Sequence, residues 1–164
     1  RQIATEAVSS LQRKAQAAVA ADKPWVLFVS FVRPHFPLVA PPEFFAMYPP
    51  AKMPLPRLYA SGERPTHEAV KALRDCMNYD DYFDEEKARI AIAAYYALVS
   101  FLDDNIGRVL GALEQAGLTD NTRIIYTSDH GDNLGNYFFT NRLVETGPTP
   151  IAADKKQQRL FAWF

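Results

Sequence analysis

Two short segments of this sequence carry residue types that could act together in chemistry. The first contains His35, which lies between two prolines directly after an apolar run. The second is the run 128–132, in which Asp129 and His130 are adjacent and again follow an apolar run. Sites in open α/β sheets form just beyond the C-terminal ends of the strands. We therefore expect His35, Asp129 and His130 to converge on one pocket.

The Asp129–His130 pair suits a metal cation. A carboxylate and an imidazole on successive residues both reach one cation if the backbone turns, and Gly131 permits that turn. Oxygen ligands favour Ca²⁺, Mg²⁺ or Mn²⁺, and an imidazole adds tolerance for Mn²⁺ or Zn²⁺. The alternative interpretation is a turn at the strand end, with Asp129 capping a helix.

His35 has a different set of possible roles. Its flanking prolines restrict the backbone, so the imidazole is placed rigidly at the end of a strand. There it could donate to an anionic substrate oxygen or protonate a leaving group. The alternative is a loop histidine packed on Phe36. Ser128 could in principle act as a nucleophile, but we discount it because no nucleophile elbow surrounds it.

Composition excludes several classes of protein. The chain of 164 residues is 48% hydrophobic, which is typical of a folded domain. Its net charge of -1 and the lack of basic runs argue against nucleic acid or a membrane surface as partner. The apolar run at 25–32 is far too short to span a bilayer. Cys76 is the only cysteine, which excludes an internal disulfide, and we interpret it as a structural or incidental thiol.

Helices and strands alternate along the chain, as in an α/β protein with a parallel sheet. The run at 25–32 is continuously apolar, which is typical of a strand buried on both faces. We expect it to be a parallel neighbour, or nearly so, of the strand at 122–127. Residues 67–80 are weakly helical, and Gly117 is a plausible helix cap. The other predicted elements are a helix at 2–20, a proline-rich loop at 33–66 and a helix at 84–115.

Three segments resemble parts of the sulfatase family, in the family's order. Residues 34–49, which begin Pro-His-Phe-Pro-Leu, resemble the histidine segment on the substrate side of sulfatases. Residues 93–110 resemble their long helix, and residues 121–135 resemble the strand and metal loop after it. The nearest branch contains the iduronate- and choline-sulfatases. The wider alkaline-phosphatase superfamily, with its phosphonate and phosphate-ester hydrolases, is the next nearest.

The resemblance implies an alkaline-phosphatase-like parallel sheet flanked by helices and a hydrolase of small-molecule or glycan sulfate esters. In that family a formylglycine, made from a Cys or Ser in a Cys/Ser-x-Pro/Ala-x-Arg motif, attacks sulfur beside a divalent cation, usually Ca²⁺. Carried over, Asp129 and His130 match metal-loop positions, where many relatives have Asn in place of the histidine. His35 matches the histidine that contacts the sulfate or aids departure of the leaving group.

The chain departs from the family pattern in three places. Cys76 lacks the formylglycine motif, and the family's N-terminal Asp-Asp metal pair is absent. After Gly135 the family's Gly-Lys segment does not follow. We therefore predict a sulfatase-like α/β portion at 1–135, a tail at 136–164 outside the pattern, and an inactive fragment of a sulfatase. Two alternatives remain: a phosphonate or phosphate-ester hydrolase, and a non-catalytic binding chain.

Overall fold

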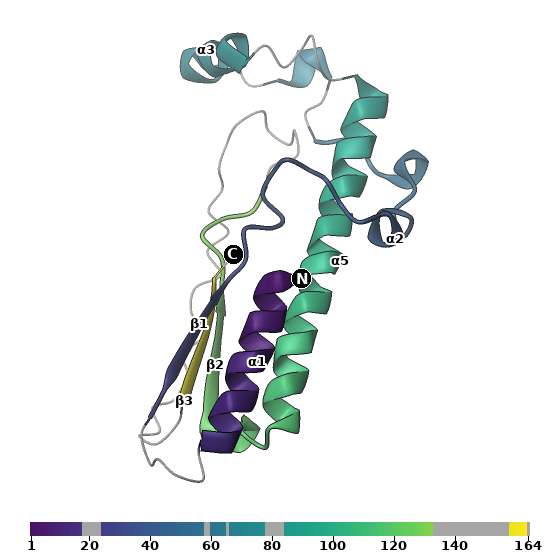
Figure 1. Cartoon of the computed structure of the whole chain (residues 1–164). Coiled ribbons are helices and arrows are strands. Elements are labelled where there is room, and N and C mark those ends of the chain that lie inside the picture. The colour runs from purple at the N-terminus through teal and green to yellow at the C-terminus, as the bar shows by residue number, and fades with distance from the viewer. Residues whose placement is uncertain (18–23, 58–59, 65, 78–83, 133–157, 164) are drawn as a thin grey trace. The chain divides into compact units, whose positions relative to one another are not determined.

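The computed structural model describes residues 1–17, 24–57, 60–64, 66–77, 84–132 and 158–163, and it has an α/β architecture (Figure 1). These residues form two compact units. Of the described residues, the first unit contains those in 1–33, in 102–129 and in the last strand, and the second contains those in 34–101 and in 130–132. In chain order the main elements are α1 (Gln2–Ala17), β1 (Val26–Ser30), α2 (Pro42–Phe45), α3 (Glu68–Met77), α5 (Glu85–Gln115), β2 (Thr122–Thr127) and β3 (Gln158–Trp163).

A three-stranded parallel sheet lies in the first unit, with strand order β1-β3-β2. Both β1 and β2 pair in parallel with β3, and Phe161 stands between Phe28 and Ile125 in the register. The prediction that the two apolar runs are nearly adjacent parallel strands of one sheet is thus confirmed, with one strand between them. The strand at 158–163 was not predicted from the sequence.

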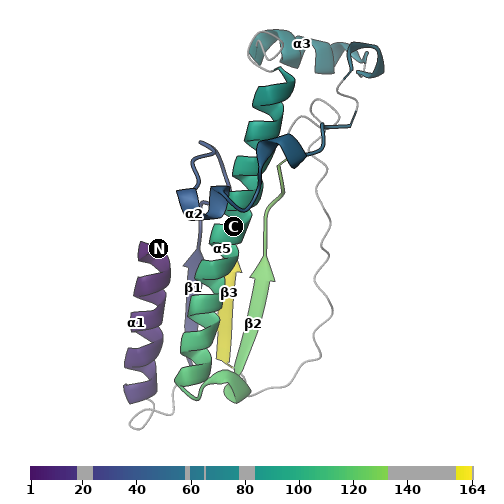
Figure 2. The ribbon, with the colours of Figure 1, turned by 90° about the vertical axis from the view of Figure 1, so that its right-hand side faces the viewer.

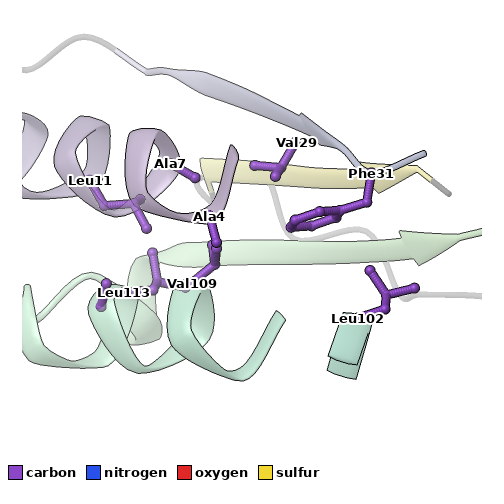
Figure 3. Close-up of a cluster of buried hydrophobic side chains, with 9 residues drawn as sticks. Ala4, Ala7, Leu11, Val29, Phe31, Leu102, Val109 and Leu113 are labelled. Atoms are coloured by element: carbon purple, nitrogen blue, oxygen red, sulfur yellow. The ribbon is translucent and has the colours of Figure 1, made fainter. Parts of the chain in front are cut away.

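The core of the first unit lies between this sheet and two helices. Figures 1 and 2 together show α1 and α5 on the same side of the strands, and Figure 3 shows the side chains that meet there. The small side chains of Ala4 and Ala7 let α1 approach closely. The buried members of this core are Ala4, Ala7, Leu11, Val29, Phe31, Leu102, Val109, Ala112 and Leu113.

The strand β1 is buried on one face only, which corrects the prediction of burial on both faces. Val29 faces the helices and is buried, whereas Val26 and Phe28 are 65% and 56% exposed. Successive side chains of a strand point to opposite faces. Within the described residues, helices pack against one face of β1, so the alternate side chains stay accessible to solvent.

The second unit contains a smaller core built on the N-terminal part of α5. Met53, Ile92 and Ala93 are buried there, and Phe45 and Tyr48 pack against them. The Tyr48 hydroxyl and the Ser100 hydroxyl share a hydrogen bond of 2.6 Å. Because α2 and the turns around it are held to a rigid helix in this way, the loop that carries His35 continues into a fixed support.

Both ends of α5 have recognisable caps. At its start, the Lys87 backbone N–H donates to Asp84 Oδ1 at 2.8 Å, and the Lys87 ammonium lies 2.9 Å from Oδ2. At its end, Gly117 adopts φ 66°, and the Leu118 N–H donates to the Leu113 carbonyl at 3.2 Å. A glycine adopts positive φ without steric cost, and the turn that this makes lets following N–H groups satisfy the last carbonyls of the helix.

No helix among the described residues has the length and apolar character needed to cross a membrane.

The cap at Asp84 should make the stability of α5 depend on pH. The backbone N–H of Lys87, and then its ammonium group, hold the pKa of the Asp84 carboxyl below its ordinary value. A lowered folded-state pKa stabilises the fold above the unfolded pKa, and that contribution is lost as pH falls through the folded value. We expect a small loss of stability in Asp84→Ala at neutral pH that disappears in acid, measured by chemical denaturation across this pH range.

Asp104→Ala, which removes an exposed carboxylate within the helix, is the matched control. A difference between the Asp84 variant and the wild type that stayed constant with pH would contradict this account.

Candidate functional site

His35 lies in the loop that follows β1, and its imidazole has a defined tautomer. Its Nδ1 lies 2.8 Å from the Phe36 carbonyl oxygen. Because a carbonyl oxygen only accepts hydrogen bonds, Nδ1 carries the proton, and the lone pair of the neutral ring is at Nε2. The imidazole also stacks on the Phe36 ring, with centroids 4.3 Å apart and planes at 28°. The packing on Phe36 anticipated from the sequence is therefore present, on the exposed surface.

His130 repeats the same arrangement in the loop after β2. Its Nδ1 lies 2.8 Å from the Gly131 carbonyl oxygen, so Nδ1 donates and the lone pair of the neutral ring is again at Nε2. A metal-binding histidine commonly donates its other ring N–H to a backbone carbonyl in this way. Asp129, directly before it, is an exposed residue in a bend. The local geometry of His130 thus suits a ligand that coordinates through Nε2.

The third histidine shows that this tautomer is not general in the chain. At His67, the Ala69 backbone N–H donates to Nδ1 at 3.2 Å, so Nδ1 holds the lone pair and Nε2 carries the proton of the neutral ring. His67 lies directly before α3 and acts there as a local cap. It is therefore an internal reference for the other two histidines.

The two candidate segments leave the same edge of one sheet. Since β1 and β2 are both parallel to β3, their C-terminal ends lie at one edge, where ligands bind in open α/β sheets. Asp129 belongs to the first unit, while His35 and His130 belong to the second. The convergence of all three side chains on one pocket therefore stays a prediction.

The donors present are of the right types for a divalent cation but are too few to enclose one. Among the described residues, no group of three or more His, Cys, Asp or Glu side chains could hold a metal ion. As predicted ligands, Asp129 and His130 would supply only two donors, whereas Ca²⁺ takes about six to eight oxygens. A complete metal site would need further donors from outside the described residues.

Cys76 and the tyrosine–serine pair lie outside the predicted set of site residues. Cys76 is an exposed thiol on α3, away from both histidine loops in sequence. Tyr48 and Ser100 support the loop that carries His35, and sequence reasoning did not identify them. The available signal was weak: Tyr96 and Ser100 are four residues apart and so share one face of α5, where Tyr96 makes an edge contact with Tyr48.

The protein has an α/β fold in which a histidine-bearing loop follows each of two parallel strands, β1 and β2. A family model described as Sulfatase matches residues 2–159, and the chain belongs to the sulfatase family. The match extends past residue 135 into the segment that the sequence analysis set apart, and the predicted division there remains untested.

Curated relatives include two sulfatases and one multifunctional protein of the alkaline phosphatase superfamily. The choline-sulfatase of Rhizobium meliloti (strain 1021) is 34% identical over 116 residues, which cover 69% of this chain and 22% of the relative. The multifunctional alkaline phosphatase superfamily protein PehA of Trinickia caryophylli is 33% identical over 133 residues, covering 74% and 26%. The iduronate 2-sulfatase of Mus musculus is 32% identical over 149 residues, covering 84% and 26%. The chain thus spans about a quarter of the length of these relatives.

Proposed function

We propose that this chain is part of a sulfatase-type hydrolase of sulfate monoesters, with the alkaline-phosphatase-like sheet that the family implies. The observation that carries the proposal is the family match over residues 2–159. The parallel sheet supports it, because both histidine loops follow strands at the edge where ligands bind. The substrates that fit are small-molecule or glycan sulfate esters.

In this proposal His35 binds the sulfate group. Its Nδ1 is engaged by the Phe36 carbonyl, so the second ring nitrogen, Nε2, is the one that acts on the substrate. Once protonated, Nε2 donates a charge-assisted hydrogen bond to a sulfuryl oxygen or passes its proton to the departing alcohol. The support that α5 gives to the loop through Tyr48 limits the loss of conformational entropy on binding.

The Asp129 carboxylate and the His130 imidazole would hold a divalent cation, Ca²⁺ in the first place or else Mn²⁺ or Mg²⁺. Such a cation supplies electrostatic stabilisation of the charge on the sulfuryl oxygens. Because two ligands bind Ca²⁺ weakly, the remaining donors are assigned to a part of the enzyme outside the described residues. The formylglycine nucleophile is likewise assigned outside this chain, since Cys76 lacks the motif.

A second candidate is hydrolysis of phosphonate or phosphate esters. The similarity to a multifunctional member of the alkaline phosphatase superfamily favours it. A tetrahedral phosphoryl group presents oxygens in nearly the same geometry as a sulfuryl group, so one histidine could bind either. The two functions differ in the anion that the histidine loop prefers.

Anion binding at His35 tests the proposed function. We expect added inorganic sulfate to shift the NMR signals of the His35 ring more than those of His67. The proposed function places sulfate at His35, whereas His67 is an exposed histidine whose Nδ1 serves as a local cap. The measurement is a titration at constant ionic strength, with His35→Ala to assign the signal.

The other outcomes of this titration are equally informative. Equal shifts of the two histidines would be a general salt effect and would contradict the proposal. A stronger response of His35 to inorganic phosphate than to sulfate would favour the second candidate function.

A further inference from the structure

A cavity of about 290 Å³ lies in the first unit, where the end of α1 meets the start of β1 (Figures 1 and 2). Ligand pockets in proteins begin at about this volume, so the cavity suits a small molecule. The histidine loops follow the opposite ends of the strands, and the five residues of β1 alone span roughly 16 Å. The cavity is therefore separate from the candidate site. Its lining residues are Ser10, Leu11, Arg13, Lys14, Ala17, Trp25, Val26 and Leu27.

Most of the lining is apolar, and one wall is aromatic. Leu11 is buried in the core of the first unit, and Trp25 and Leu27 are half-buried and pack against that core. The indole ring has a broad apolar face on which flat rings stack. Because core packing already holds Trp25 at the wall, little side-chain entropy is lost when a ligand binds there. The cavity thus favours a ligand with a flat apolar body.

The polar side chains at the cavity come from one face of α1. Arg13 and Lys14 follow Ser10 by three and four residues, the spacing of neighbours on a helix surface. The Arg13 guanidinium donates from Nη2 to the Ser10 hydroxyl at 2.9 Å, and this bond holds the guanidinium on that face. The described residues that line the cavity include two cations and no carboxylate. An oxyanion is the group that complements such a pair.

The position at the end of a helix explains only part of this charge. Lys14 lies in the last turn of α1, where a cation stabilises the negative end of the helix dipole. That end carries about half of an elementary charge, whereas the ammonium of Lys14 and the guanidinium of Arg13 together carry two positive charges. The surplus of positive charge favours an anion over a neutral or cationic ligand.

We propose that this cavity binds a small amphipathic anion, with its flat apolar body against Trp25 and its oxyanion head at Arg13 and Lys14. The Ser10 hydroxyl accepts a hydrogen bond from Arg13, so its own proton is left to donate to the head group. A carboxylate and a sulfonate both present oxygens that these donors bind. The inference does not depend on the proposed function, because the cavity shares no lining residue with the candidate site.

The indole N–H signals in NMR spectra of the 164-residue chain test this proposal. The chain has two tryptophans, so Trp163 supplies a reference signal and Trp25→Phe assigns the other. We expect 2-naphthalenesulfonate and 2-naphthoate to shift the Trp25 signal, and the tighter of the two identifies the preferred head group. The neutral 2-naphthalenemethanol should bind about tenfold more weakly, because it forms no charge pairs with the two exposed cations. Methanesulfonate should also bind at least about tenfold more weakly, because it lacks the apolar rings.

A pair of variants separates the cavity from general charge effects. Arg13→Gln/Lys14→Gln should lower the affinity for both naphthalene anions about tenfold and leave that for the neutral alcohol unchanged. The matched control is Lys52→Gln/Lys71→Gln, which removes the same charge from exposed positions outside the lining and should bind as the wild type does.

Four results would overturn the inference. The first is equal affinity for the anions and the neutral alcohol, and the second is an anion affinity that survives Arg13→Gln/Lys14→Gln. The third is equal affinity for methanesulfonate and 2-naphthalenesulfonate, because the two cations alone would then account for binding. The fourth is a Trp25 signal that no naphthalene anion shifts more than the signal of Trp163.

Discussion

The isolated chain should hydrolyse aryl sulfates poorly or not at all, even with Ca²⁺, Mg²⁺ or Mn²⁺ added. Cleavage in this family needs an activated nucleophile, and Cys76, an exposed thiol on α3, lacks the maturation motif. Ser128 has no nucleophile elbow around it. Removing a catalytic nucleophile costs on the order of 10⁶-fold in turnover in well-studied hydrolases. We expect a rate lower by a similar factor than that of a complete sulfatase, measured with a nitrophenyl or methylumbelliferyl sulfate.

Incomplete metal coordination lowers the expected rate further. In the proposed site Asp129 and His130 would give only two ligands, and the described residues contain no group of three or more His, Cys, Asp or Glu that could hold a metal ion. Substantial metal-dependent turnover that is abolished by Asp129→Ala, but kept in the matched surface variant Asp120→Ala, would overturn this prediction. Turnover that Asp129→Ala leaves unchanged would come from a contaminating enzyme.

Local sequence pattern was sufficient where an element carries its own signals. The strand at 122–127 has the predicted bounds, and α5 begins one residue later than predicted and ends at Gln115 as expected. Acidic residues at the start and Gly117 at the end are short-range capping signals that act within one turn. The helix predicted at 2–20 is present as Gln2–Ala17, and its last three predicted residues lie outside the described part.

Contacts between distant residues could not be predicted in the same way. The hydrogen bond between Tyr48 and Ser100 spans 52 residues, and neither residue type marks such a contact in a sequence. The one-sided burial of β1 depends on which elements reach its other face, and an apolar run does not carry that information. At the candidate site, the roles of His35 and His130 stay predictions, and the tautomers of their rings follow from carbonyl positions that only coordinates supply.

The strand β3 is the clearest case of an element that depends on its partners. Gln158–Trp163 is only six residues long, and its local sequence does not mark it as the central strand of a sheet. Its pairing with β1 joins residues that are more than one hundred positions apart in the chain, as in Phe28 opposite Phe161. Non-local pairing of this kind is set by the whole fold, and it makes the sheet vulnerable to changes at one strand.

A proline in the middle of β3 should therefore disrupt the sheet of the first unit. Leu160 stands opposite Leu27 on one side and Ile124 on the other, so its N–H belongs to the ladder of a central strand. Proline lacks that N–H and is tolerated only at the edges or first residues of strands. We expect Leu160→Pro to lower the free energy of unfolding by about 2 kcal/mol or more, because a carbonyl acceptor in the sheet loses its donor. Amide exchange protection should fall along β1 and β2 together.

The matched variant Gln158→Pro places proline at the first position of the strand and should lower the free energy of unfolding much less. If both variants kept full protection at Phe28 and Ile125, the segment 158–163 would not be the central strand of this sheet.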